Sequence, residues 1–207
     1  FIDPSIGFNP GSLEDIYILL DDIDNYYYYF GPSQTTAYAY SKTDFYNDPL
    51  SRVKRTGAPG YNYCLDSDNE PRFWYFGVST MTTTPAFNGT TVKIEDGFIK
   101  EFTPPGDWFD LLNKYYEYSL SNPIEDASHY LTVTMDPDEK ITQELKDLFG
   151  RTVATHAFVQ DASGNRDLIA SYEYDILGNV LKEIPPGELG EDHHTYYKYN
   201  TLGQLIY

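Results

Sequence analysis

The pattern Asp-x-x-Gly recurs through the last third of the chain and constrains its fold more than any other feature. The first three copies are 14 residues apart, and a fourth, with Asn in place of Asp, follows 25 residues after the third: Asp147–Gly150, Asp161–Gly164, Asp175–Gly178 and Asn200–Gly203. Asp and Asn side chains hydrogen-bond to the backbone two residues on, and Gly supplies the positive φ of a tight turn. The pattern predicts a series of β-hairpins.

The last two copies match over a longer stretch, "YEYDILGNVL" against "YKYNTLGQLI". Tyr172 and Tyr174 in the first correspond to Tyr197 and Tyr199 in the second. Side chains alternate between the two faces of a strand, so each Tyr-x-Tyr places two rings on one face. A hairpin of this kind cannot bury its apolar face alone, so we interpret these segments as an internal repeat whose units stack.

The composition points to the same fold class. The chain has 21 Tyr, 12 Phe, 15 Gly and 13 Pro in 207 residues, which favours many short strands and tight turns. We predict a mostly-β fold of successive antiparallel β-hairpins in a ribbon or spiral sheet. One hairpin is expected around Glu95–Gly97. One or two short helices are expected in the N-terminal two-thirds: one after Ser12, where a strand is the alternative, and one that starts after Pro105 and is closed by Pro123.

The sequence divides into three parts. Residues 1–36 form an N-terminal segment that we interpret as an assembly arm, residues 37–130 an irregular β region, and residues 131–207 the repeated hairpins. The chain begins at Phe1 and ends at Tyr207, and these apolar ends lead us to expect a piece of a longer product.

A formal charge of −18 argues against nucleic acid and against anionic membrane surfaces as partners. No apolar run approaches 18 residues, so we expect no membrane span. Cys64 is the only cysteine, which excludes an internal disulfide and a multi-cysteine metal site. We expect an inert thiol there, with an intermolecular bridge as the alternative.

No cofactor or metal is expected. Calcium is the weakly supported alternative in two acidic segments, residues 21–24 and 66–70, with Asp66 and Asp68 as the candidate ligands of the second. Glu191 and His193 are weak candidates for another metal. We interpret all three segments as solvated loops. Asn88 begins an Asn-x-Thr sequon, so glycosylation is chemically open to it. The one basic cluster, Arg52–Arg55, is interpreted as a charged strand face or as a contact for an acidic patch on a neighbouring subunit.

We predict that the protein is not an enzyme. No nucleophile, zinc or phosphate-binding signature is present, and no spacing selects a pair of carboxylates for glycoside hydrolysis. Trp74 and Trp108 are candidate exposed aromatics of a glycan-binding or glycan-processing module, which is the alternative function.

Tyr172–Leu181 resembles the YD repeat of the RHS (rearrangement hotspot) family, whose pattern is Tyr-x-Tyr-Asp-x-x-Gly-Arg/Asn followed by an apolar pair. Lys146–Val153 fits the Gly-Arg variant. The longer stretch Thr134–Val153 also resembles the family's strand-turn-strand pattern, although Glu139 stands where a turn glycine is expected. Upstream, Tyr40–Gly60 is similar to the amino-terminal region of RHS proteins from Bacteroidetes-type bacteria.

The resemblance implies a large secreted or surface protein of a bacterium, whose hairpins spiral into a hollow shell that often encloses a toxin. Four repeats are too few to close such a shell. We therefore expect an extracellular structural protein whose partners are further repeats of a longer chain or copies of itself in a self-assembling filament. The alternative is a carbohydrate-binding or cell-contact adhesin module, with glycans as partners.

Overall fold

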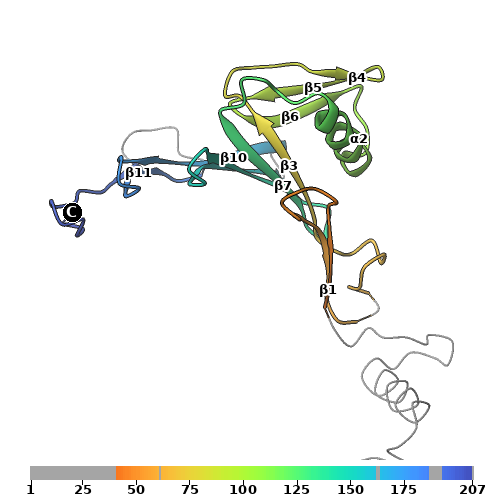
Figure 1. Ribbon diagram of the computed structural model, residues 1–207, viewed down its shortest axis with the longest axis horizontal. Coiled ribbons are helices and arrows are strands. Elements are labelled where there is room, and N and C mark those ends of the chain that lie inside the picture. The colour runs from red at the N-terminus through yellow and green to blue at the C-terminus, as the bar shows by residue number, and fades with distance from the viewer. Residues whose placement is uncertain (1–40, 61, 162–163, 187–192, 207) are drawn as a thin grey trace, which may run out of the picture. The chain divides into compact units, whose positions relative to one another are not determined.

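The computed structural model describes residues 41–60, 62–161, 164–186 and 193–206 (Figure 1). The fold is mostly β with antiparallel sheets, and the described residues contain one helix, as the composition predicted. The segment 1–36 and the helix expected after Ser12 lie outside the described residues. The elements are β1 (Lys42–Phe45), β2 (Val53–Gly57), β3 (Arg72–Val78), β4 (Ala86–Phe87), β5 (Thr90–Glu95), β6 (Phe98–Thr103), α2 (Trp108–Ser121), β7 (His129–Met135), β8 (Ile141–Asp147), β9 (Thr152–Asp161), β10 (Gly164–Tyr174), β11 (Val180–Ile184) and β12 (Thr195–Tyr196).

Contacts divide the chain into two units, Phe1–Pro71 and Arg72–Tyr207. The described part of the first unit is built on the antiparallel β1–β2 hairpin. The guanidinium of Arg55 forms ion pairs there with three carboxylates, those of Asp44, Asp66 and Glu70. Glu70 is buried, and burying a carboxylate without such a partner is costly.

In the second unit the strands of the main sheet follow the order β3-β7-β8-β9-β10-β11-β12. From β7 onward each strand pairs antiparallel with the next strand in the sequence. The succession of antiparallel hairpins predicted from the repeats is therefore confirmed. Local pairing also explains the register, because each short turn leaves its two strands only one way to align.

The segment between β3 and β7 forms a second sheet, β4-β5-β6, and the helix α2. The hairpin predicted around Glu95–Gly97 joins β5 to β6, with Asp96 at φ 54° and Gly97 at φ 83°. The predicted helix starts at Trp108, where the side chain of Asp107 accepts the N–H of Phe109, and ends before Pro123. No helix within the described ranges is long and apolar enough to cross a membrane.

α2 buries one face against both sheets, as the ribbon also shows (Figure 1). Its buried Tyr115 stacks on Phe76 of β3 at 5.1 Å between ring centroids and lies 5.7 Å from the ring of Phe87 in β4. Trp74 of β3 donates its indole N–H to Asn113 of α2 and is 1% exposed. The expectation of an exposed Trp74 was wrong, because α2 covers the face of β3 that carries this side chain.

A buried polar contact joins the β5–β6 hairpin to the main sheet. The side-chain amide of Gln143 in β8 accepts the N–H of Ile99 at 2.9 Å and donates to its C=O at 2.8 Å. The same amide nitrogen lies 3.0 Å from Nδ1 of His156, which stacks near Phe98. Gln143 and His156 are each 1% exposed, so these hydrogen bonds satisfy groups that would otherwise be costly to bury.

Candidate functional site

Five turns among the described residues share one hydrogen-bond arrangement, which we call the Asx-closed turn. Oδ1 of the first residue accepts the backbone N–H groups of the third and fifth residues, and the first carbonyl accepts the N–H of the fourth. The five are Asp48–Arg52, Asp136–Lys140, Asp147–Arg151, Asp175–Asn179 and Asn200–Gln204. One short side chain thus satisfies two backbone donors in each turn.

The fourth residue of every Asx-closed turn has positive φ. Gly150, Gly178 and Gly203 have values of 82°, 90° and 75°. The other two turns have Ser51 at 47° and Glu139 at 61°. Residues other than Gly, Asn and Asp rarely adopt this backbone conformation. A sequence pattern that requires Gly at the fourth position therefore finds three of the five turns and misses those with Ser51 and Glu139.

The pair Asp161 and Gly164 is placed differently. These residues are cross-strand partners, at the end of β9 and the start of β10. The connection between them joins the ends of β9 and β10, whereas the turns of Asp147 and Asp175 join β8 to β9 and β10 to β11. In an antiparallel sheet these connections lie at opposite ends, so the structural repeat is a hairpin of two strands and the 14-residue spacing is half of it.

Arg151 connects two successive Asx-closed turns. It closes its own turn through Nε and Asp147 Oδ2, 2.7 Å apart, and its Nη1 donates to the backbone carbonyl of Asp175 at 3.1 Å. Its guanidinium carbon lies 4.9 Å from the ring centroid of Tyr174, and the Tyr174 hydroxyl donates to the carbonyl of Thr152 at 2.6 Å. The Tyr, Asp and Arg of the repeat therefore bind one hairpin to the next.

The two turn carboxylates are held in their charged form. Burial alone would raise the pKa of Asp147, but the backbone N–H and guanidinium of Arg151 hold that pKa below its ordinary value. The side-chain amide of Asn179 and its backbone N–H lower the pKa of Asp175 in the same way. Hydrogen bonds to the ionised form are the cause in both cases.

The remaining repeat aromatics lie on β10 and around β12. Tyr172 faces Glu183 across the β10–β11 pair, and the hydroxyl of Tyr197 donates to Oε2 of Glu183 at 2.9 Å. Tyr199 forms an isolated antiparallel bridge with Leu205 around the last turn. Tyrosines of two successive repeat copies therefore lie next to Glu183.

The turn tips carry exposed apolar side chains. In the second unit these are Leu148 (61% exposed), Phe149 (86%), Ile176 (99%), Leu177 (79%) and Leu202 (80%). The corresponding turns all lie at one end of the main sheet, because they alternate with the connections at its other end. Apolar groups left in water along one rim favour contact with another surface.

The weak metal candidates do not come together. Asp66 is paired with Arg55, His193 lies in a separate exposed segment, and Glu191 is outside the described residues. Within the described ranges no three His, Cys, Asp or Glu side chains are grouped as metal ligands. Cys64 is half-buried and forms no disulfide within the described residues.

Asn88 occupies the exposed two-residue turn between β4 and β5, at φ 45°. The basic cluster is bound within its own unit, since Arg52 pairs with Asp48 and Arg55 with its three carboxylates. Lys54 lies over the ring of Tyr46, 5.9 Å from its centroid.

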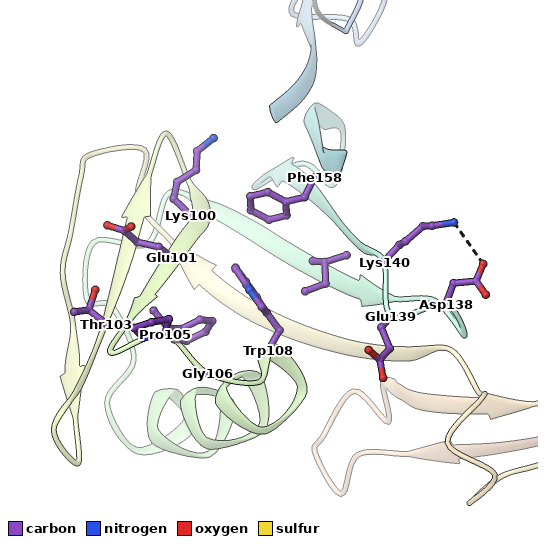
Figure 2. Close-up of a pocket in the computed structure, with 12 residues that line it drawn as sticks. Lys100, Glu101, Thr103, Pro105, Gly106, Trp108, Asp138, Glu139, Lys140 and Phe158 are labelled. Atoms are coloured by element: carbon purple, nitrogen blue, oxygen red, sulfur yellow. Dashed lines mark hydrogen bonds and ion pairs between the residues drawn. The ribbon is translucent and has the colours of Figure 1, made fainter. Parts of the chain in front are cut away.

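A cleft of about 1100 Å³ opens between β6, the start of α2, the β7–β8 turn and β9 (Figure 2). Its apolar wall is aromatic: the ring of Trp108 lies 5.0 Å from Phe102 and 5.4 Å from Phe158, centroid to centroid. Ile141 and Pro105 extend this wall, and the charged lining residues are Lys100, Glu101, Asp138, Glu139 and Lys140.

Of these cleft residues, sequence reasoning identified only Trp108 as a binding aromatic. Phe158 is 50 residues away in the sequence and reaches the cleft through the pairing of β8 and β9. The one sequence signal that could have pointed to this cleft was Glu139, because it stands where the repeat pattern expects a turn glycine.

No protein-family model and no curated protein sequence matches this chain.

Proposed function

We propose that this chain is a non-enzymatic structural β-scaffold of the RHS/YD-repeat kind, located outside a bacterial cell or on its surface. It forms either part of a secreted shell or a subunit of a self-assembling fibre. The observation that carries the proposal is the linkage of successive turns by Arg151 and Tyr174.

The linkage supports an architectural role because it uses the repeat's distinctive residues for stacking. Asp147 closes its turn, Arg151 spans to the following turn, and Tyr174 returns a hydrogen bond to the preceding hairpin. The β8–β9 and β10–β11 hairpins therefore present groups to each other, which is how repeat arrays gain stability from nearest-neighbour contacts.

The last strand of the main sheet supports the choice of partner. β12 pairs with β11 alone among the described strands, so its outer edge carries backbone groups that another strand can bind. The segment after the last turn folds back along this chain, since Leu205 forms a bridge with Tyr199 and the N–H of Ile206 donates to the carbonyl of Lys198. Tyr196 of β12, Leu205 and Ile206 are 52%, 58% and 57% exposed. Exposed apolar side chains at a sheet edge favour the addition of a further hairpin, from the same product or from a second copy.

Electron microscopy and light scattering of the purified chain test the proposal. Polymers or closed shells are expected, and the double variant Leu205→Lys/Ile206→Lys should reduce them because charge on an edge opposes strand addition. Leu120→Lys, at a 60% exposed position on α2, is the matched control and should assemble normally. A compact, ordered monomer of the unmodified chain at all concentrations would overturn the proposal.

A further inference from the structure

The charges of the Trp108 cleft leave a net negative site. Two lysines and three carboxylates line it. Lys140 is paired with Asp138 at 3.4 Å, and Lys100 with Asp167 at 3.1 Å. In Figure 2 the Lys140 side chain extends away from Trp108 toward Asp138. The lysine charges are therefore already compensated. Glu101 stands opposite Lys93 across the β5–β6 pair, so the carboxylate of Glu139 remains.

Glu139 is held at this site against its backbone preference. It occupies the fourth position of an Asx-closed turn at φ 61°, where three sister turns have Gly. Its side chain is exposed and forms no hydrogen bond or ion pair with any residue that the structure describes. Residues that are held in a strained backbone conformation, with a side chain that makes no structural contact, are often found at functional sites.

An aromatic wall beside an uncompensated carboxylate is suited to an organic cation. The faces of Trp and Phe rings attract ammonium and guanidinium groups, Trp most strongly, while the apolar wall accepts the methylene stem of a Lys or Arg side chain. The −18 charge of the chain adds a long-range attraction for basic ligands.

We propose that the Trp108 cleft binds a lysine or arginine side chain presented by an extended segment of a partner protein. Trp108 and Phe158 contact the stem and the cationic head, and Glu139 neutralises its charge. This binding site is separate from the turn contacts on which the scaffold proposal rests.

Isothermal titration of the full chain with acetyl-Gly-Lys-Gly-amide tests the proposal, with acetyl-Gly-norleucine-Gly-amide as the probe that lacks the ammonium group. The lysine peptide should bind about tenfold more tightly than the norleucine peptide, and its affinity should fall as salt is added. Glu139→Gln and Trp108→Leu should each weaken binding about three- to tenfold. Glu125→Gln removes an exposed carboxylate that does not line the cleft and should leave the affinity unchanged.

Glu139→Gly separates a binding role from a structural one. Because Gly relieves the positive φ, this variant should bind the lysine peptide more weakly while its Tm rises by about 2 °C or more. Equal affinity for the two peptides, or no saturable binding of either, would overturn the proposal. Tighter binding of cadaverine would also overturn it in favour of a small diamine, and binding of chitotetraose instead would overturn it in favour of a glycan.

Discussion

Replacing Arg151 by Asn separates the closure of one turn from its attachment to the next. Asn179 already fills the same position in the following turn, where its Nδ2 donates to Asp175 Oδ2 at 2.8 Å. The Arg151→Asn variant can therefore keep the bond to Asp147. Within its own turn it loses the guanidinium contact with the exposed ring of Phe149. Between the turns it loses two contacts, the bond to the Asp175 carbonyl and the guanidinium contact with Tyr174.

The expected loss follows from those two contacts. Hydrogen bonds from charged groups contribute about 1.5–3 kcal/mol, but the Arg151 side chain is 29% exposed, so the lower end applies. An exposed cation–π contact adds about 0.5–1 kcal/mol. Non-additivity reduces the sum, and we expect the free energy of unfolding to fall by about 1–2 kcal/mol.

Urea unfolding measures the effect. With a slope of about 2 kcal/mol/M the midpoint should fall by about 0.5–1 M. Gln204→Asn is the matched control, since it shortens the fifth residue of the last turn, for which no link to a further turn is seen in the described residues. It should change the free energy by less than about 0.5 kcal/mol.

A double-mutant cycle tests whether the ring of Tyr174 is the energetic partner of Arg151. Tyr174→Leu removes the ring, so its effect should couple to Arg151→Asn by about 0.5–1 kcal/mol. Tyr174→Phe keeps the ring and loses only the bond to Thr152, so its cost of about 1 kcal/mol should add to that of Arg151→Asn. Additivity within about 0.3 kcal/mol for both pairs would refute an energetic link between the turns.

Three further predictions concern the same sheet. Gly178→Val should lower the free energy of unfolding by about 1 kcal/mol or more, because Gly178 has φ 90°, a backbone conformation that Val rarely adopts. The space around Gly178 is open, so this cost arises from the backbone and not from a clash, and an unchanged Tm would contradict the prediction. Asn179→Arg should raise the urea midpoint, with a gain of about 0.5–1 kcal/mol from cation–π contact with the Tyr199 ring, and no gain would mean that the Arg151 link is not transferable. Burial, and then the charge of Lys100, lowers the pKa of His156, so the neutral ring stabilises the fold above the ordinary His pKa and this contribution is lost as pH falls through the lowered value. Stability should therefore fall as pH drops below about 6.5 and fall less in His156→Gln, and parallel pH profiles of the two proteins would exclude His156 as the cause.

The fold class and the repeated hairpins could be predicted because their signals are local. Asp, Asn and Gly determine each turn within five residues, and Asp107 and Pro123 delimit α2 in the same way. The turn that ends at Lys140 was harder to predict, because Glu139 stands at the position where the pattern expects Gly. Propensity rules do not predict residues in a strained conformation.

The cleft and the buried Gln143–His156 contact could not be predicted from the sequence. Gln143 and Ile99 are 44 residues apart, and their contact exists only once α2 and two sheets have packed. Trp74 shows the same limit, because the sequence alone does not reveal which aromatic strand a helix will cover.

The two ends of the main sheet should tolerate changes of length differently. The Arg151–Tyr174 linkage lies at the end that bears the turns of Asp147, Asp175 and Asn200. The opposite end bears the Asp136–Lys140 turn, and it also joins β9 to β10 through residues 162–163 and β11 to β12 through residues 185–194. Insertions should therefore accumulate at that opposite end, where longer loops have a small entropic cost. An engineer who wishes to display a peptide on this scaffold should graft it there.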